Sequence, residues 1–170
     1  MGYRNCNRNS CGVVSSVIFF VGIGLIKPKI IISDNICFTP DENSTDPSKG
    51  TYRIKVVNKS KVMLTNLTYI LLYVKNRGNE VFSVEEIPTI KNTLKFIDKY
   101  KGDEDYSDYA VRIAFKYDKD KYPLTDGAKL NFIIFAEHSY SNKSKCYKKV
   151  YFEKNIKTGK YQIGKSTKIV

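Results

Sequence analysis

An uncharged apolar run near the N-terminus constrains this chain more than any other feature. The run from Cys11 to Ile26 reads CGVVSSVIFFVGIGLI, sixteen residues without proline, and Lys27-Pro28-Lys29 follows it directly. As a helix the run would rise about 24 Å, less than the roughly 30 Å hydrocarbon core of a bilayer. It could still span the membrane if the bilayer thins locally and Lys27 reaches the headgroups. We therefore predict a marginal membrane anchor, with a cleaved signal peptide and a segment buried in the core as the alternatives.

The predicted anchor divides the chain into a polar tail (1–10), an anchor helix (11–26) and one folded domain (27–170). The positive-inside rule does not orient this single span, because two arginines precede it and two lysines follow it closely. The side chains expected to contact lipid are Val13, Val14, Val17, Ile18, Phe19, Phe20, Val21, Ile23, Leu25 and Ile26.

Beyond Pro28 the hydrophobic pattern is typical of β-strands. The clearest two-residue period runs from Tyr109 to Tyr117, and Tyr52, Ile54 and Val56 alternate with Arg53 and Lys55, which predicts one buried face and one solvent face. The expected strands are Lys29–Ser33 continued by Ile36–Thr39, Tyr52–Val56, Leu67–Val74 in a central position, Thr89–Ile97, Tyr109–Tyr117, Lys129–His138, Cys146–Lys154 and Lys160–Ile169. Without a convincing amphipathic helix after the anchor, the pattern predicts an all-β fold, an antiparallel sandwich of about seven to nine strands.

The order of segments at the start of this domain resembles a known family. Lys27-Pro28-Lys29 after an apolar span, the run from Asn35 to Pro40, a loop ending in Gly50 and the strand Tyr52–Asn58 are similar to the start of the cytoplasmic domain of inward-rectifier potassium channels. The segments Phe132–Ser139 and Ile156–Gly164 fit that domain's closing strands more loosely. The resemblance implies an immunoglobulin-like sandwich on the cytoplasmic side of a membrane that assembles around an axis and responds to anionic lipid. Conduction is not implied, because the chain has no selectivity filter and only one span.

Basic residues are concentrated near the C-terminus. The chain carries a net charge of +12, and the segment 141–170 holds nine lysines and one acid, Glu153. Such a surface favours phosphate groups, while the alternative is that lysines keep exposed strand edges soluble. The residues expected to contact anionic headgroups or another anionic ligand are Lys27, Lys29, Lys145, Lys148, Lys149 and Lys154.

The cysteines and the lone histidine predict neither a metal site nor a disulfide framework. No C-x-x-C occurs, and His138 is the only histidine, so the chain lacks a zinc ligand set. Cys37 and Cys146 fall on different expected strands, where they could pair in an oxidising compartment or remain as buried free thiols.

Two enzyme-like patterns are better explained without catalysis. Residues Gly159 to Ser166 match the phosphate-loop pattern G-x-x-x-x-G-K-[ST], but only four residues follow, too few for the helix whose N-terminal amides hold phosphate. His138 lies between Glu137 and Ser139, and neighbours in a strand point to opposite faces, so they cannot form a proton relay. His138 is therefore expected as a strand-end residue.

The sequence thus predicts a non-enzymatic, single-pass membrane protein whose β-sandwich serves interaction, assembly or ligand sensing on the cytoplasmic face. Its expected partners are the membrane, anionic lipid, and a second copy or a partner protein; nucleic acid is not favoured for the anchored domain. No cofactor is expected. The alternative is a soluble or exported sandwich whose basic face binds a phosphate-bearing ligand, including a nucleotide or nucleic acid.

Overall fold

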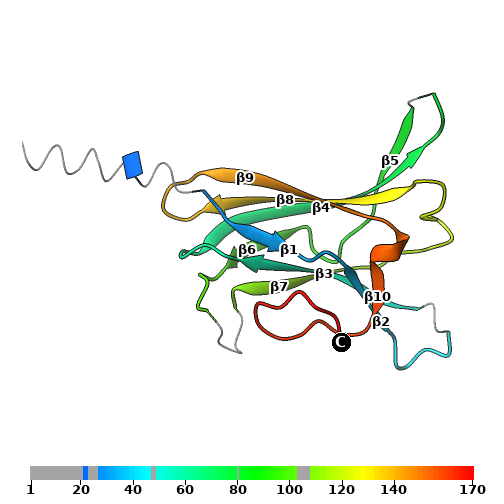
Figure 1. Cartoon of the computed structure of the whole chain (residues 1–170), viewed down its shortest axis with the longest axis horizontal. Coiled ribbons are helices and arrows are strands. Elements are labelled where there is room, and N and C mark those ends of the chain that lie inside the picture. The colour runs from blue at the N-terminus through cyan, green and yellow to red at the C-terminus, as the bar shows by residue number, and fades with distance from the viewer. Residues whose placement is uncertain (1–20, 23–26, 47–48, 80, 103–107) are drawn as a thin grey trace, which may run out of the picture.

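The computed structural model describes residues 21–22, 27–46, 49–79, 81–102 and 108–170, which form two packed β-sheets (Figure 1). These residues contain ten strands and one short 3-10 helix, η1 (Glu153–Asn155), so the prediction of an all-β sandwich is confirmed. The number of strands exceeds the predicted seven to nine, and two of the ten strands are only three residues long. Of the predicted anchor only Val21 and Gly22 are described, and the helix over 11–26 lies outside the described residues. Within the described ranges no helix has the length and apolar character needed to span a membrane.

Sheet A is built around β3 (Gly50–Asn58). The short strands β1 (Ile30–Ile32) and β2 (Ile36–Pro40) pair with one edge of β3, and β7 (Ala110–Phe115) pairs with its other edge. β10 (Ile156–Thr158) pairs with β2 in parallel. The predicted interruption after Ser33 is real, because β1 and β2 follow the same edge with a gap at residues 33–35.

Sheet B is built around β4 (Leu64–Asn76), as its predicted central position requires. β8 (Lys129–His138) pairs with one edge of β4 and carries β9 (Ser144–Tyr151) on its far side. β5 (Phe82–Glu86) and β6 (Thr93–Ile97) share the other edge of β4. The predicted strand Thr89–Ile97 is therefore shorter than expected, and Thr89 forms only an isolated bridge to Phe115.

The hydrophobic core lies between the two sheets and uses every second residue of the long strands. The alternation predicted for β3, β7 and β8 is confirmed on this inner face, because a pleated strand presents successive side chains to opposite sides. The buried inner-face residues include Tyr52, Ile54, Val56, Ile113 and Phe115 from sheet A and Leu67, Tyr69, Leu71, Leu130, Phe132 and Ile134 from sheet B.

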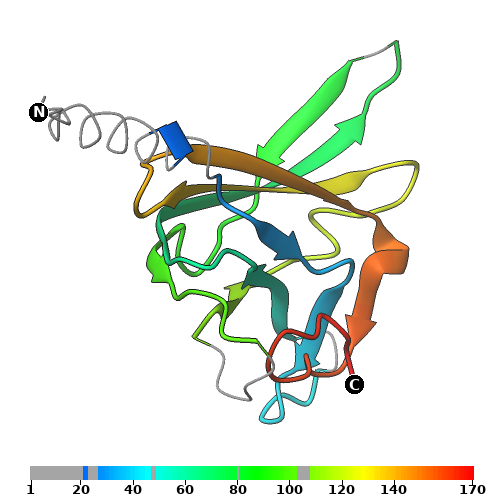
Figure 2. The same ribbon diagram turned by 60° about the vertical axis from the view of Figure 1, so that its left-hand side comes forward.

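The outer face of sheet A differs from the prediction. Lys55, expected in solvent, is only 1% exposed, and Val57 on the same face is buried. The cause is the C-terminal segment: the strand predicted at Lys160–Ile169 is wrong, and those residues form a loop that folds back beside β2 and β3 (Figure 2). Burial of Lys55 is thus imposed by residues more than 100 positions away.

Candidate functional site

The C-terminal loop begins at Gly159, where the chain leaves β10 and turns over sheet A. Gly159 has a φ of +145°, and a Cβ atom there would lie 2.3 Å from the carbonyl oxygen of Val170. Only glycine fits without displacing the C-terminus. Reciprocal backbone hydrogen bonds of 2.8 and 2.9 Å between Lys160 and Val170 close the loop.

Tyr161 fastens this loop to the gap between β1 and β2. Its hydroxyl lies 2.9 Å from Ser33 Oγ, 2.5 Å from the Asn35 carbonyl oxygen and 3.2 Å from the Arg53 carbonyl oxygen. Burial raises the pKa of Tyr161 to about 12, so the hydroxyl stays neutral near pH 7 and can donate. The side chain therefore supplies polar partners where the strand pairing is interrupted.

Lys55 is the second attachment point of the loop. Its ammonium donates to the carbonyl oxygens of Gln162 at 2.6 Å and Ser166 at 2.7 Å. Lys55 also lies directly opposite Arg112 in the β3–β7 register. Burial first, and the Arg112 charge second, lower the pKa of Lys55 to about 8. The two carbonyl oxygens thus hold a cation that has no carboxylate partner among the described residues.

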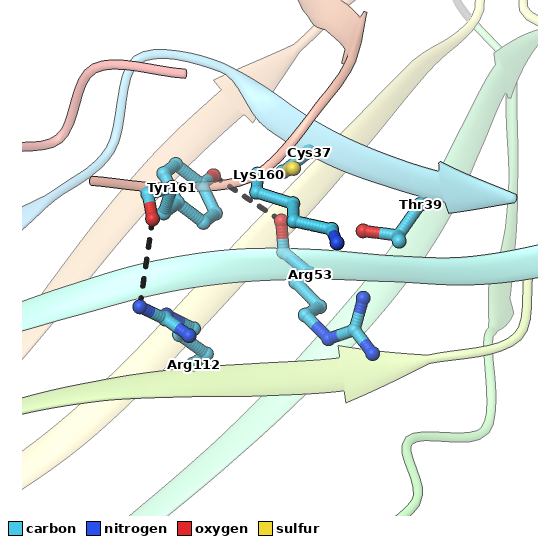
Figure 3. A pocket seen from close by; sticks show the side chains of 6 residues that line it. All are labelled: Cys37, Thr39, Arg53, Arg112, Lys160 and Tyr161. Atoms are coloured by element: carbon cyan, nitrogen blue, oxygen red, sulfur yellow. Dashed lines mark hydrogen bonds between the residues drawn. The ribbon is translucent and has the colours of Figure 1, made fainter. Parts of the chain in front are cut away.

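A cavity of about 230 Å³ lies beside Tyr161 on the outer face of sheet A (Figure 3). Figure 3 shows that the Arg112 guanidinium turns toward the Tyr161 carbonyl oxygen, at 3.5 Å, while Arg53 and Lys160 extend away from it. The six lining residues are Cys37, Thr39, Arg53, Arg112, Lys160 and Tyr161. Three of them are cations and none is an acid, so the cavity is suited to an anion.

Cys37 is a structural thiol of this cavity and not an activated nucleophile. Its Sγ donates to the Gly159 carbonyl oxygen at 3.0 Å, and Thr39 Oγ1 donates to the same oxygen at 3.2 Å. Burial raises the pKa of Cys37, although Arg53 and Arg112 act in the opposite direction. The thiol is therefore protonated at neutral pH, and the thiolate is the nucleophilic form.

The two described cysteines are both free. Cys37 is buried on β2 of sheet A, whereas Cys146 is exposed on β9 of sheet B. The disulfide alternative is not formed in this structure, and the expectation that both free thiols are buried is wrong for Cys146. Its side chain lies on the outer face of an edge strand, which nothing in the described part of the chain covers.

Three of the predicted headgroup lysines gather where the apolar N-terminal run joins the domain. Tyr147 Oη on β9 donates to the carbonyl oxygen of Pro28, the residue between the exposed Lys27 and Lys29. Lys145 Nζ lies 4.7 Å from the centre of the Tyr147 ring. Tyr147 thus contacts both Lys145 and the residue that Lys27 and Lys29 flank.

The other three predicted lysines do not join them. Lys148 points to the opposite face of β9 because successive strand residues alternate. Lys149 forms an ion pair with Asp34 at 2.5 Å, and Lys154 lies in η1, beyond the other end of β9. Strand alternation separates Lys148 from Tyr147, while an ion pair and a position past β9 separate Lys149 and Lys154. Contact of any of the six lysines with an anionic group stays a prediction.

The phosphate-loop pattern falls on the C-terminal loop, but this loop binds a cation instead of an anion. No helix begins at Lys165 or Ser166, and the backbone of the loop presents carbonyl oxygens to Lys55 rather than N–H groups to a phosphate. Four of the six residues that line the cavity were missed because they occupy solvent-face positions of β2, β3 and β7, and the other two, Lys160 and Tyr161, were assigned to a strand that is a loop. Arg53 and Arg112, both outward-facing in their strands, were the available signal.

His138 ends β8, as predicted, and is fully buried. Its Nδ1 accepts a hydrogen bond of 3.3 Å from the Ser141 N–H, and its Nε2 has no partner within the described ranges. It lies in sheet B, in a different sheet from the strands that line the cavity.

No protein-family model matches the chain, and no curated protein is significantly similar to it. The geometry of the cavity and of the loop therefore carries the functional interpretation.

Proposed function

We propose that this chain is a non-enzymatic, membrane-anchored β-sandwich whose basic cavity binds a phosphate-bearing anion. The observation that carries the proposal is the cavity itself, which Arg53, Arg112 and Lys160 line without an acidic residue. The Arg53 guanidinium has no hydrogen-bond or ion-pair partner among the described residues. Guanidinium groups match phosphate oxygens in geometry and charge, so an anion would supply the missing partner.

The size and chemistry of the cavity favour binding of a single phosphate group over catalysis. Its volume of about 230 Å³ is below the 300–1,000 Å³ typical of sites for drug-sized ligands. Its side chains are cations, hydroxyls and a protonated thiol, without a carboxylate or histidine to act as a general base. A ligand would therefore be held by its anionic group, with the rest of the molecule outside.

The membrane part of the proposal rests on the apolar run 11–26 and on the lysines beside it. Tyr147 contacts Pro28, which Lys27 and Lys29 flank, and also Lys145, so we infer that these three charges face the headgroups of an adjacent bilayer. Each such lysine contributes about 1 kcal/mol near an anionic surface. An immunoglobulin-like topology, the cytoplasmic side and assembly with a second copy or partner protein are proposed on the resemblance to the channel domain alone, which is clearest over residues 27–58 and looser over the closing strands.

Isothermal titration of the full chain in detergent with inorganic phosphate tests the cavity. Arg53→Gln and Arg112→Gln should each weaken binding by about tenfold or more, since a charged hydrogen bond contributes about 1.5–3 kcal/mol. Lys148→Gln is the control, because it removes one positive charge from the other sheet. It should change phosphate affinity by less than about twofold, since salt screens distant exposed charges. Equal weakening by all three variants would show that only net charge matters and would reject a specific cavity.

Carbonate extraction tests the anchor. The full chain should remain with the membrane pellet, and a variant lacking residues 11–26 should move to the supernatant. Release of the full chain would support the alternative of a soluble or exported module, for which the same cavity would serve.

A further inference from the structure

Lys55 and the residues that line the cavity belong to one basic surface. Arg53 and Lys55 point from the same side of β3, about 7 Å apart along the strand, and Arg112 lies directly across from Lys55 on β7. The C-terminal loop divides this surface. It leaves Arg53 and Arg112 at the cavity and buries Lys55.

The loop occupies Lys55 as a ligand would. The carbonyl oxygens of Gln162 and Ser166 lie 2.6 and 2.7 Å from the ammonium, the distances expected for charged hydrogen bonds. These oxygens are neutral dipoles, and burial together with the Arg112 charge lowers the pKa of Lys55 to about 8. The contact therefore satisfies the hydrogen bonds of Lys55 without neutralising the local positive charge, which an anion would do.

The loop is held by few buried contacts. Tyr161 and Gly164 are buried, but Ile163 and Val170 are 66% and 72% exposed. Gly159 and Tyr161 fix the start of the loop to β2, to the gap after β1 and to Arg112. Beyond Tyr161 the two bonds from Lys55 hold it to sheet A, while the Lys160–Val170 pair and a Gln162–Lys168 hydrogen bond of 3.1 Å only close the loop on itself. Segments with little buried apolar surface open locally at low cost, so the part beyond Tyr161 can separate from Lys55 without unfolding the sandwich.

We propose that the Gln162 and Ser166 carbonyl oxygens fill a second anion subsite at Lys55, which a ligand with two linked phosphate groups occupies when the C-terminal loop is displaced. This inference rests on the proposed function, because the first phosphate binds at Arg53 and Arg112. The second phosphate replaces two neutral oxygens with charged ones beside Lys55 and Arg112. The loop is thus an internal competitor that favours single phosphates over diphosphates.

Displacing the loop without altering a lining residue provides the test. Gly159→Ala places a Cβ against Val170 at a φ of +145°, and deletion of Val170 removes both hydrogen bonds to Lys160. The matched control is Gly127→Ala, in a turn at a φ of +76° with no atom near the new Cβ. Thermal melting confirms that each variant is folded, and hydrogen exchange at the Gln162 and Val170 amides, or at Gln162 alone in the deletion, reports loop opening.

Binding of orthophosphate and pyrophosphate to the full chain is then compared by titration. Both loop variants should raise the ratio of pyrophosphate affinity to orthophosphate affinity about tenfold over the wild type. A shift of Lys160 and Tyr161 in the cavity affects both anions, whereas only pyrophosphate gains Lys55. Adding Lys55→Met should abolish the gain, whereas adding Lys148→Met should preserve it. An unchanged affinity ratio in both loop variants, or a gain that survives Lys55→Met, overturns the second subsite while orthophosphate binding still supports the cavity. Absence of orthophosphate binding from every variant overturns the cavity and this inference together.

Discussion

Tyr151 on β9 donates its hydroxyl to the carbonyl oxygen of Ser33 at 2.7 Å and so joins an edge of sheet B to an edge of sheet A. Two neighbouring side chains of β9 repeat the connection, Tyr147 to Pro28 and Lys149 to Asp34. An edge strand ordinarily offers unpaired backbone groups to other chains, and lysines discourage such pairing. β9 therefore uses its inner-face side chains to close the sandwich and places Lys148 on the outside.

Loss of the Tyr151 hydroxyl should destabilise this seam. Tyr151→Phe leaves the buried Ser33 carbonyl oxygen without that donor, so the free energy of unfolding should fall by about 1–3 kcal/mol in urea titrations. Tyr140→Phe is the matched control, because Tyr140 is 73% exposed and its change should stay under about 0.5 kcal/mol. Similar losses for both variants would mean that the Tyr151–Ser33 hydrogen bond does not contribute measurably to stability.

Truncation of a buried residue should cost far more stability than truncation of its exposed neighbour at the end of β7. Phe115 is fully buried, so Phe115→Ala should cost about 3–5 kcal/mol through lost burial and a residual cavity. Lys116→Ala next to it removes an exposed side chain and should cost less than about 0.5 kcal/mol. Equal shifts in the thermal melting midpoint would contradict the register.

Stability should fall as the pH decreases below about 6.5, because of His138. Burial lowers the pKa of His138 in the folded state, so the unfolded chain, with an ordinary pKa of about 6.5, binds this proton first. The contribution of His138 to the free energy of unfolding is therefore fully present above about pH 6.5 and is lost as the pH falls toward the folded-state pKa. A protonated Nδ1 could also no longer accept from the Ser141 N–H.

Urea titrations at pH 7.5 and 5.5 measure this effect. The chain has one histidine, so His138→Gln should remove most of the difference between the two pH values. The carboxyl groups titrate mainly below this range. A difference that persists in the variant would assign the pH dependence to other groups.

Membrane topology can be read from Cys146, which is exposed, while Cys37 is 1% exposed. In a variant with Cys6 and Cys11 replaced by serine, a membrane-impermeant thiol reagent should leave both cysteines unmodified in intact cells. After lysis it should label Cys146 at once and Cys37 only after unfolding. Labelling of Cys146 before lysis would place the domain outside the cell.

Local periodicity was enough to predict most of the long strands and their buried faces. Tyr52, Ile113 and Phe132 lie in the core because a strand alternates its side chains, and that alternation is visible in the sequence. The same rule correctly assigned Lys55 to the outer face of β3, although that face is covered at this point. The errors are the short strands β5 and β10, which were not predicted, the shortened β6, and the segment Lys160–Ile169, which is a loop and not a strand.

What covers an outer face was decided only by the tertiary structure. Lys55 is buried because Gln162 and Ser166 lie over it, a contact across more than 100 residues that no local pattern encodes. Cys37, Arg53 and Arg112 come from three strands, and only the pairing of those strands with one another, closed over by Lys160 and Tyr161, makes them one cavity. The sequence by itself determined composition, charge and which side of each strand a residue occupies. The site depends on which distant segment meets that side, because hydrogen bonding and burial are settled by neighbours in space.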